Sequence, residues 1–147
     1  SSRMPGDHIA RFPVMEHETL TAAGLFCRFL IGQQASENPV MAQAADRILA
    51  KAPRWEPEAG RVDYTFWAFG SLAMYQMGDR YWSRWSRFLT SALLGAQRKQ
   101  PGFNGSWDSC GPWGESGGRV YSTALASIAL QTVYRYERLA GRSKKNR

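Results

Sequence analysis

Two different kinds of helix are predicted, one after the other, in residues 62–98, VDYTFWAFGSLAMYQMGDRYWSRWSRFLTSALLGAQR. The first part, Val62–Met77, is apolar on nearly every side, which is typical of a helix buried on most faces. Gly78 and Asp79 end this helix. In the second part, Arg80–Arg98, apolar residues recur at the helical period and polar residues occupy the opposite side. The stretch therefore predicts a buried helix followed by an amphipathic surface helix.

The same alternation of helix types extends to both sides of this stretch. Thr19–Gln33 is apolar nearly all round, so we expect a helix buried on most faces, with Cys27 as a small buried residue. Pro39–Ala52 has a single apolar stripe and predicts a second amphipathic helix, with Asn38 as its N-cap. A long glycine-rich loop precedes a last, largely apolar helix at Arg119–Ala140. No segment has the sustained alternation of a strand.

Short motifs that begin with Ser or Thr open the three apolar helices and indicate an internal repeat. Their threonines, Thr21, Thr65 and Thr123, are 44 and 58 residues apart. Units of this size with two helices each are typical of helical repeat arrays. We therefore predict an all-α fold in which inner and outer helices alternate in two layers, and a single domain that covers residues 1–147.

Composition excludes several classes of protein. The chain has 147 residues, of which 44% are hydrophobic and 21% are charged, as in ordinary globular domains. No apolar run approaches the ~20 residues that span a bilayer. Much of the net charge of +7 lies near the C-terminal end, where residues 142–147 form a basic tail. Since no nucleic-acid-binding motif accompanies it, we predict no nucleic-acid partner. Two cysteines without CxxC spacing slightly favour a cytoplasmic location.

The loop before the last helix carries a motif of a known family. Gln97 is followed by Gly105-Ser106-Trp107, then by GPWG at 111–114 and GGRVYSTALA at 117–126. This pattern resembles the prenyltransferase and squalene-cyclase (squalene oxidase) repeat, in the form of uncharacterised bacterial members of the terpenoid cyclase and protein prenyltransferase superfamily. The resemblance covers Thr65–Leu139. It implies an α/α toroid in which the Gln and Trp side chains stack and tie neighbouring helices together, although the gap after Gln97 is longer than the family's usual one.

The resemblance does not extend to the family's catalytic groups. Triterpene cyclases use a D-x-D-D acid, and no such motif occurs here. Protein prenyltransferases bind zinc through Asp-x-Cys and a downstream His. Asp108 and Cys110 match the first half as weak candidates, but His8 and His17 both lie upstream. Because a catalytic zinc needs about three protein ligands, we expect no catalytic residue, metal or cofactor, and we predict that this chain alone is not an enzyme.

Aromatic residues offer a candidate ligand site. In terpene cyclases, rings that line the cavity stabilise carbocations by cation–π attraction. The candidates near the predicted starts of inner helices are Tyr64, Trp67, Trp113 and Tyr121. In the fold that the resemblance implies, these starts face the cavity mouth. The alternative is that the rings pack in the core.

An array that ends on an inner helix would leave a ring unfinished. We therefore expect the C-terminal part of a larger toroid, with apolar surface exposed on Val62–Met77 and Arg119–Ala140. The partner would be the remainder of that toroid, another protein, a hydrophobic ligand or a second copy in a symmetric dimer. The predicted function is a non-catalytic repeat module that binds such a partner at the concave end of its inner helices, or a structural cap of a larger array. The alternative is a fragment of an isoprenoid-processing enzyme whose catalytic acid lies outside this chain.

Overall fold

The computed structural model describes Ala10 and residues 18–135, and they form helices and loops only. The helices are α2 (Thr19–Leu30), α3 (Pro39–Ala50), α4 (Tyr64–Met77), α5 (Asp79–Ala96) and α6 (Gly114–Arg135). The all-α prediction is thus confirmed for the described part of the chain. None of these helices combines the length and the hydropathy needed to cross a membrane. The predicted helix end at Ala140 and the basic tail at 142–147 lie outside the described residues.

The starts of α3 and α4 follow from their local sequence. The side chain of Asn38 accepts a hydrogen bond from the backbone N–H of Val40 (3.2 Å), and Pro39 occupies the first turn of α3. The predicted N-cap is therefore confirmed. Asp63 caps α4 in the same way, by accepting from the backbone N–H of Phe66 (3.0 Å). Because of this cap, α4 begins two residues later than predicted.

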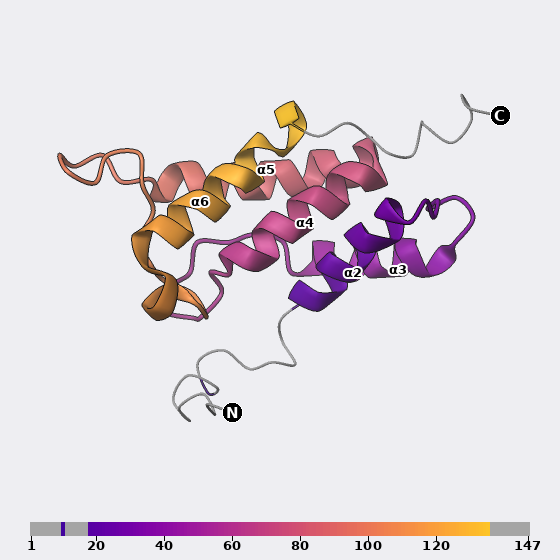
Figure 1. Cartoon of the computed structure of the whole chain (residues 1–147), viewed down its shortest axis with the longest axis horizontal. Helices are drawn as coiled ribbons and strands as arrows, with labels where there is room; N and C mark the ends of the chain where they lie inside the picture. The colour runs from indigo at the N-terminus through magenta and orange to yellow at the C-terminus, as the bar shows by residue number, and fades with distance from the viewer. Residues whose placement is uncertain (1–9, 11–17, 136–147) are drawn as a thin grey trace.

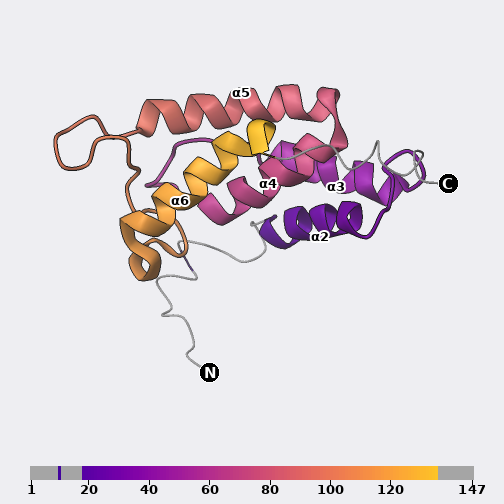
Figure 2. The same ribbon diagram turned by 45° about the horizontal axis from the view of Figure 1, so that its top comes forward.

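The helices pack in two layers with α4 at the centre (Figures 1 and 2). α2, α4 and α6 lie side by side in one layer, and α3 and α5 cover one side of it. α4 packs against each of the other four helices, which explains why its sequence is apolar on nearly every side. The hydroxyl of Thr19 also donates a hydrogen bond to Asp63 Oδ2 (3.0 Å), which ties the start of α2 to the start of α4. The apolar surface expected to be exposed on Val62–Met77 is therefore largely covered.

The prediction of a helix buried on most faces is wrong for α2. Its buried residues are Ala22, Leu25 and Phe29. Leu20 is 84% exposed and Ile31, just after the helix, is 74% exposed. Cys27, predicted to be buried, is exposed as well. The reason is that α2 lies at the edge of its layer, where α3 and α4 cover one side and the apolar opposite side faces outward.

The glycine-rich loop before α6 depends on close contact with the backbone at the entry to α4. A Cβ atom on Gly111, whose φ is +99°, would lie 2.6 Å from the carbonyl oxygen of Val62. Only glycine tolerates both this conformation and this distance. Gly118 then kinks α6, and the regular helix after the kink begins where the sequence predicts it, at Arg119.

Candidate functional site

Two of the predicted ligand-binding residues, Tyr64 and Trp67, lie in the core at the start of α4. Both are 1% exposed, and their ring centroids are 5.7 Å apart in an edge-to-face arrangement. Trp55, from the loop after α3, completes the cluster, with its centroid 6.3 Å from that of Tyr64 and 6.4 Å from that of Trp67. The Tyr64 hydroxyl donates to the carbonyl of Asp108 (2.8 Å), and burial raises the pKa of this phenol far above its usual value. These contacts correspond to the core-packing alternative, and ligand binding by the two rings stays a prediction.

The other two candidates, Trp113 and Tyr121, reach the surface. Trp113 is 47% exposed in the loop immediately before α6. Tyr121 is half-buried on α6, and its hydroxyl shares a 2.5 Å hydrogen bond with the hydroxyl of Thr65 on α4. Burial raises the pKa of Tyr121 as well. The four predicted aromatic residues are thus divided between the core and the surface of the described structure.

Trp107 links the end of α5 to the start of α6. Its side chain is buried, and its indole N–H donates to the carbonyl of Leu93 on α5 (2.7 Å). The backbone N–H of Trp107 donates to Thr123 Oγ1 (3.3 Å), and its carbonyl accepts from Ser122 Oγ (2.9 Å). Trp107 therefore joins two helices through three hydrogen bonds, one from its buried indole and two from its backbone.

Gln97 and Gly105 close the loop that presents Trp107. The side-chain amide of Gln97 donates to the carbonyl of Gly105 (3.0 Å). Next to it, the backbone of Arg98 donates to Ser106 (2.9 Å) and accepts from Gly105 (2.8 Å). The three residues of the predicted repeat motif therefore lie close together, with Gln97 bonded to the backbone of the loop.

Asp108, one of the two weak metal candidates, is held by two arginines. Its carboxylate accepts hydrogen bonds from Arg98 and forms an ion pair with Arg119, whose Nη1 lies 2.8 Å from Oδ1. The guanidinium of Arg98, helped by that of Arg119, holds the pKa of this carboxyl below its usual value. The carboxylate thus clamps the end of α5 to α6 across the loop.

The second metal candidate, Cys110, lies beside the aromatic cluster. Its Sγ is 3.8 Å from the hydroxyl of Tyr64. In the described part of the chain, no three His, Cys, Asp or Glu side chains are grouped so that they could hold a metal ion. His8 and His17 lie outside that part. The arrangement around Asp108 and Cys110 is consistent with a structural role for this loop.

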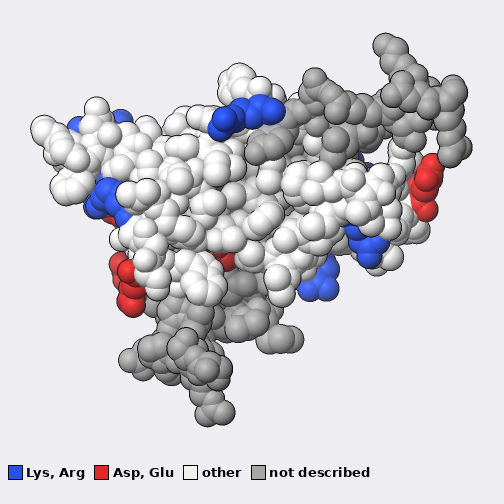
Figure 3. Space-filling model, in the orientation of Figure 1, with Lys and Arg blue, Asp and Glu red and all other residues white. Residues whose placement is uncertain are grey.

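The layer of α2, α4 and α6 presents a face that is almost free of charged side chains, which gather at its rim (Figure 3). Two rows of partly buried side chains contribute to it, namely Thr65, Phe69 and Leu72 on α4 and Tyr121, Leu125 and Ile128 on α6. α3 and α5 cover the side of α4 that faces away from this surface. The exposed parts of Thr65, Phe69 and Leu72 therefore lie on the uncharged face. The hydrogen bond between Thr65 and Tyr121 joins the two rows.

Of these six residues, only Tyr121 was a predicted ligand-binding residue. The signal that could have found the others is the equal spacing of the two rows, which both follow i, i+4, i+7. This spacing places each row on one side of its helix. It could not show from the sequence which side other helices cover.

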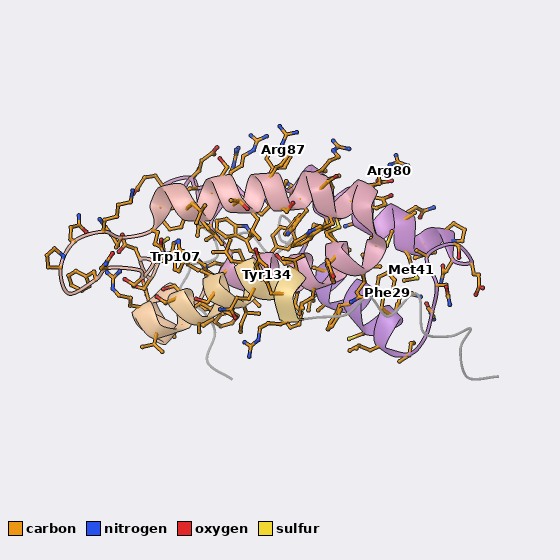
Figure 4. All side chains as sticks on the ribbon, turned by 90° about the horizontal axis from the view of Figure 1, so that it is seen from above. Phe29, Met41, Arg80, Arg87, Trp107 and Tyr134 are labelled. Atoms are coloured by element: carbon orange, nitrogen blue, oxygen red, sulfur yellow. The ribbon has the colours of Figure 1, made fainter. Side chains whose placement is uncertain are left out.

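The opposite side of the molecule carries a row of arginines. Arg80, Arg84 and Arg87 are exposed and follow the same i, i+4, i+7 spacing on α5. In Figure 4, Arg80 and Arg87 project away from both helix layers. The described structure therefore has one uncharged side and one basic side.

Comparisons with known proteins provide no relative from which a role could be transferred. No protein-family model matches the chain, and no curated protein and no solved structure matches it.

Proposed function

We propose that this chain is a non-catalytic helical repeat module that binds a hydrophobic ligand or an apolar segment of a partner protein. The proposed binding surface is the uncharged face, at the two rows on α4 and α6. The observation that carries the proposal is the juxtaposition of these rows, which the hydrogen bond between Thr65 and Tyr121 joins, in a layer whose outer face is almost free of charged side chains (Figure 3). The six side chains are half-buried, and the parts of them that reach the surface form an apolar patch of the kind that often marks a binding site.

The chemistry of the rows supports an apolar ligand. Four of the six side chains are hydrocarbon, and the two hydroxyls, of Thr65 and Tyr121, satisfy each other. A ligand that covers them would therefore leave no unpaired polar group behind. Binding would be driven by the removal of apolar surface from water.

The finer fold assignment, an α/α toroid, belongs to the same proposal. The alternation of helices between two layers supports it, as does the position of Trp107 between α5 and α6. A fragment of an isoprenoid-processing enzyme remains the alternative function, because the same motif is shared by the enzymes that the sequence resembles.

Fluorescence of an uncharged hydrophobic dye such as Nile red tests the proposed binding surface. We expect the folded protein to increase dye emission, and Ile128→Gln on α6 to weaken the effect by placing a polar amide in the row. Phe88→Gln on α5 is the matched control, since Phe88 is 42% exposed but lies on the other layer. It should leave dye binding unchanged. Circular dichroism would verify that both variants remain helical, and an absence of dye binding by the folded protein would contradict the proposal.

A further inference from the structure

The outer side of α2 is apolar although no described helix covers it. Its exposed row consists of Leu20, Gly24, Cys27 and Ile31. Leu20 is 84% exposed and Ile31 is 74% exposed, and a Cβ atom on Gly24 would meet nothing within 4 Å. The buried residues Ala22, Leu25 and Phe29 lie on the other side of the same helix. α2 therefore has two apolar sides, of which the fold uses one.

The exposed row has the same pattern when it is read in either direction. The spacing from Leu20 to Ile31 is four, three and four residues, which keeps the row on one side of a helix. Along it, the side chains are large, small, small and large. We propose that this row binds α2 of a second copy of the chain in an antiparallel pair. The two-fold axis would pass at the level of Leu25 and Phe26, so that Leu20 meets Ile31 and Gly24 meets Cys27.

A pair of this kind is isologous, because both copies contribute the same surface. The small residues at its centre allow the two helix axes to approach to about 8 Å. With a rise of about 1.5 Å per residue and a Cα radius of about 2.3 Å, the Cα atoms of the two Cys27 residues would be roughly 6 Å apart. That distance lies within the range of disulfides. Leu20 and Ile31 would cover each other at both ends of the pair.

Two charged residues near the row, Arg28 and Glu18, have partners within their own chain. Arg28 donates to the side-chain carbonyl of Gln33 (2.8 Å), and Glu18 forms an ion pair with Arg47 (2.8 Å). The basic row of α5 belongs to the other layer. The helix of 12 residues offers a strip of about 18 Å by about 11 Å, roughly 200 Å² per copy. Since stable interfaces bury about 800 Å² per partner, we expect a weak dimer that forms as the concentration rises.

Sedimentation velocity over a range of concentrations tests the pair. The wild-type protein should shift from monomer towards dimer, and Leu20→Glu should remain a monomer because it would bury a carboxylate against Ile31 of the second copy. Val120→Glu is the matched control, since Val120 is 83% exposed on α6 and should not affect the dimer. A protein that stays monomeric at every concentration would overturn the proposal. So would a dimer that Val120→Glu abolishes and Leu20→Glu does not.

Thiol oxidation gives a second and independent readout. With diamide as the oxidant, two Cys27 thiols lose two protons and two electrons to the azo group and form one disulfide. We expect the Cys110→Ser variant, in which Cys27 is the remaining thiol, to become a covalent dimer. The control carries Ala124→Cys together with Cys27→Ser and Cys110→Ser, which moves the exposed thiol to α6. Equal cross-linking of the two proteins would contradict the α2 pair.

This inference does not depend on the proposed ligand-binding face. Leu20→Glu should abolish the dimer but leave dye binding at α4 and α6 intact. Ile128→Gln should weaken dye binding and leave the dimer intact. If the row instead contacts a different protein or further helices of a longer chain, purified copies of this chain will remain monomers and the proposed pair is wrong.

Discussion

The indole N–H of Trp85 on α5 donates a 2.9 Å hydrogen bond to the hydroxyl of Ser71 on α4. The same indole lies against Gly70, where an added Cβ would be only 2.5 Å from Cζ2 of Trp85. Trp85 is fully buried, and Phe66 contacts it edge-on with a centroid distance of 5.6 Å. A small residue at position 70 is therefore a condition for the contact between the two layers.

Gly70→Ala should destabilise the protein by about 1–3 kcal/mol, because the buried Trp85 ring has no room to move away from the new methyl group. Urea unfolding followed by circular dichroism would measure the loss. Gly95→Ala is the matched control, since a Cβ at that exposed helical glycine meets nothing within 4 Å. It should be neutral or stabilise the protein by up to about 1 kcal/mol. If both variants changed the free energy of unfolding equally, Gly70 would not be closely packed against Trp85.

Trp107→Ala should lower the free energy of unfolding by about 3–5 kcal/mol, the usual cost of removing a buried aromatic side chain. The loss includes the hydrogen bond from the indole to the carbonyl of Leu93. Trp113→Ala removes a half-exposed indole six residues away and should cost less than about 1 kcal/mol. Chemical denaturation of both variants would give the comparison. A cost below about 1 kcal/mol for Trp107→Ala would refute its role in joining α5 to α6.

Cys27 should react with a thiol reagent in the native protein faster than Cys110. Cys27 is exposed, whereas Cys110 is partly buried beside Tyr64. Access to the reagent limits the rate for a thiol that packing protects. Reaction of the Cys110→Ser and Cys27→Ser variants with Ellman's reagent, at a protein concentration low enough to keep monomers, isolates each thiol. Protection of Cys27 under these conditions would show that another part of the chain covers the outer side of α2.

Stability should depend on pH through Asp108. Arg98 and Arg119 lower the pKa of this carboxyl in the folded state. The ionised carboxylate therefore contributes to the free energy of unfolding at pH values above its unfolded-state pKa of about 4. The contribution is lost as the pH falls through the lower folded-state pKa. Asp108→Asn should therefore be less stable than the wild type near neutral pH, and the difference should shrink in acid.

Urea midpoints measured at neutral pH and below about pH 4 would test this expectation. Glu58→Gln, at an exposed loop position, controls for the loss of one carboxylate. If Asp108→Asn and Glu58→Gln shifted the urea midpoints equally at both pH values, the ion pairs of Asp108 with the two arginines would make no net contribution to stability.

Local signals predicted the start of α3 well. Asn38 and Pro39 determine this start by themselves, because an N-cap and a first-turn proline act over a few residues. The start of α4 was predicted two residues early, since Val62 continues the apolar pattern and only the hydrogen bond from Phe66 to Asp63 shows where the helix begins. The position of Trp107 between two helices was likewise expected from its motif, but its bond to Leu93 joins residues 14 apart and needed the structure.

The sequence could not predict which of the four aromatic candidates are buried and which reach the surface. Tyr64 and Trp67 are aromatic residues of the kind that line ligand cavities. In the structure Trp55 packs on both rings, which are buried in the core. The apolar character of a residue does not reveal whether another side chain or a ligand will cover it.

The sequence by itself determined that the described part of the chain is helical, where α2 and α3 begin, and which helices have apolar sides. These properties depend on the helical period, on capping side chains and on glycine, all of which act between residues near one another in the chain. Only the tertiary structure decided which apolar sides are buried. α2 and α4 are both apolar on several sides, but α4 packs against four other helices and is largely covered, whereas α2 lies at the edge and leaves Leu20 and Cys27 exposed. Burial depends on the number of neighbours that a helix has in space, and no local pattern encodes that number.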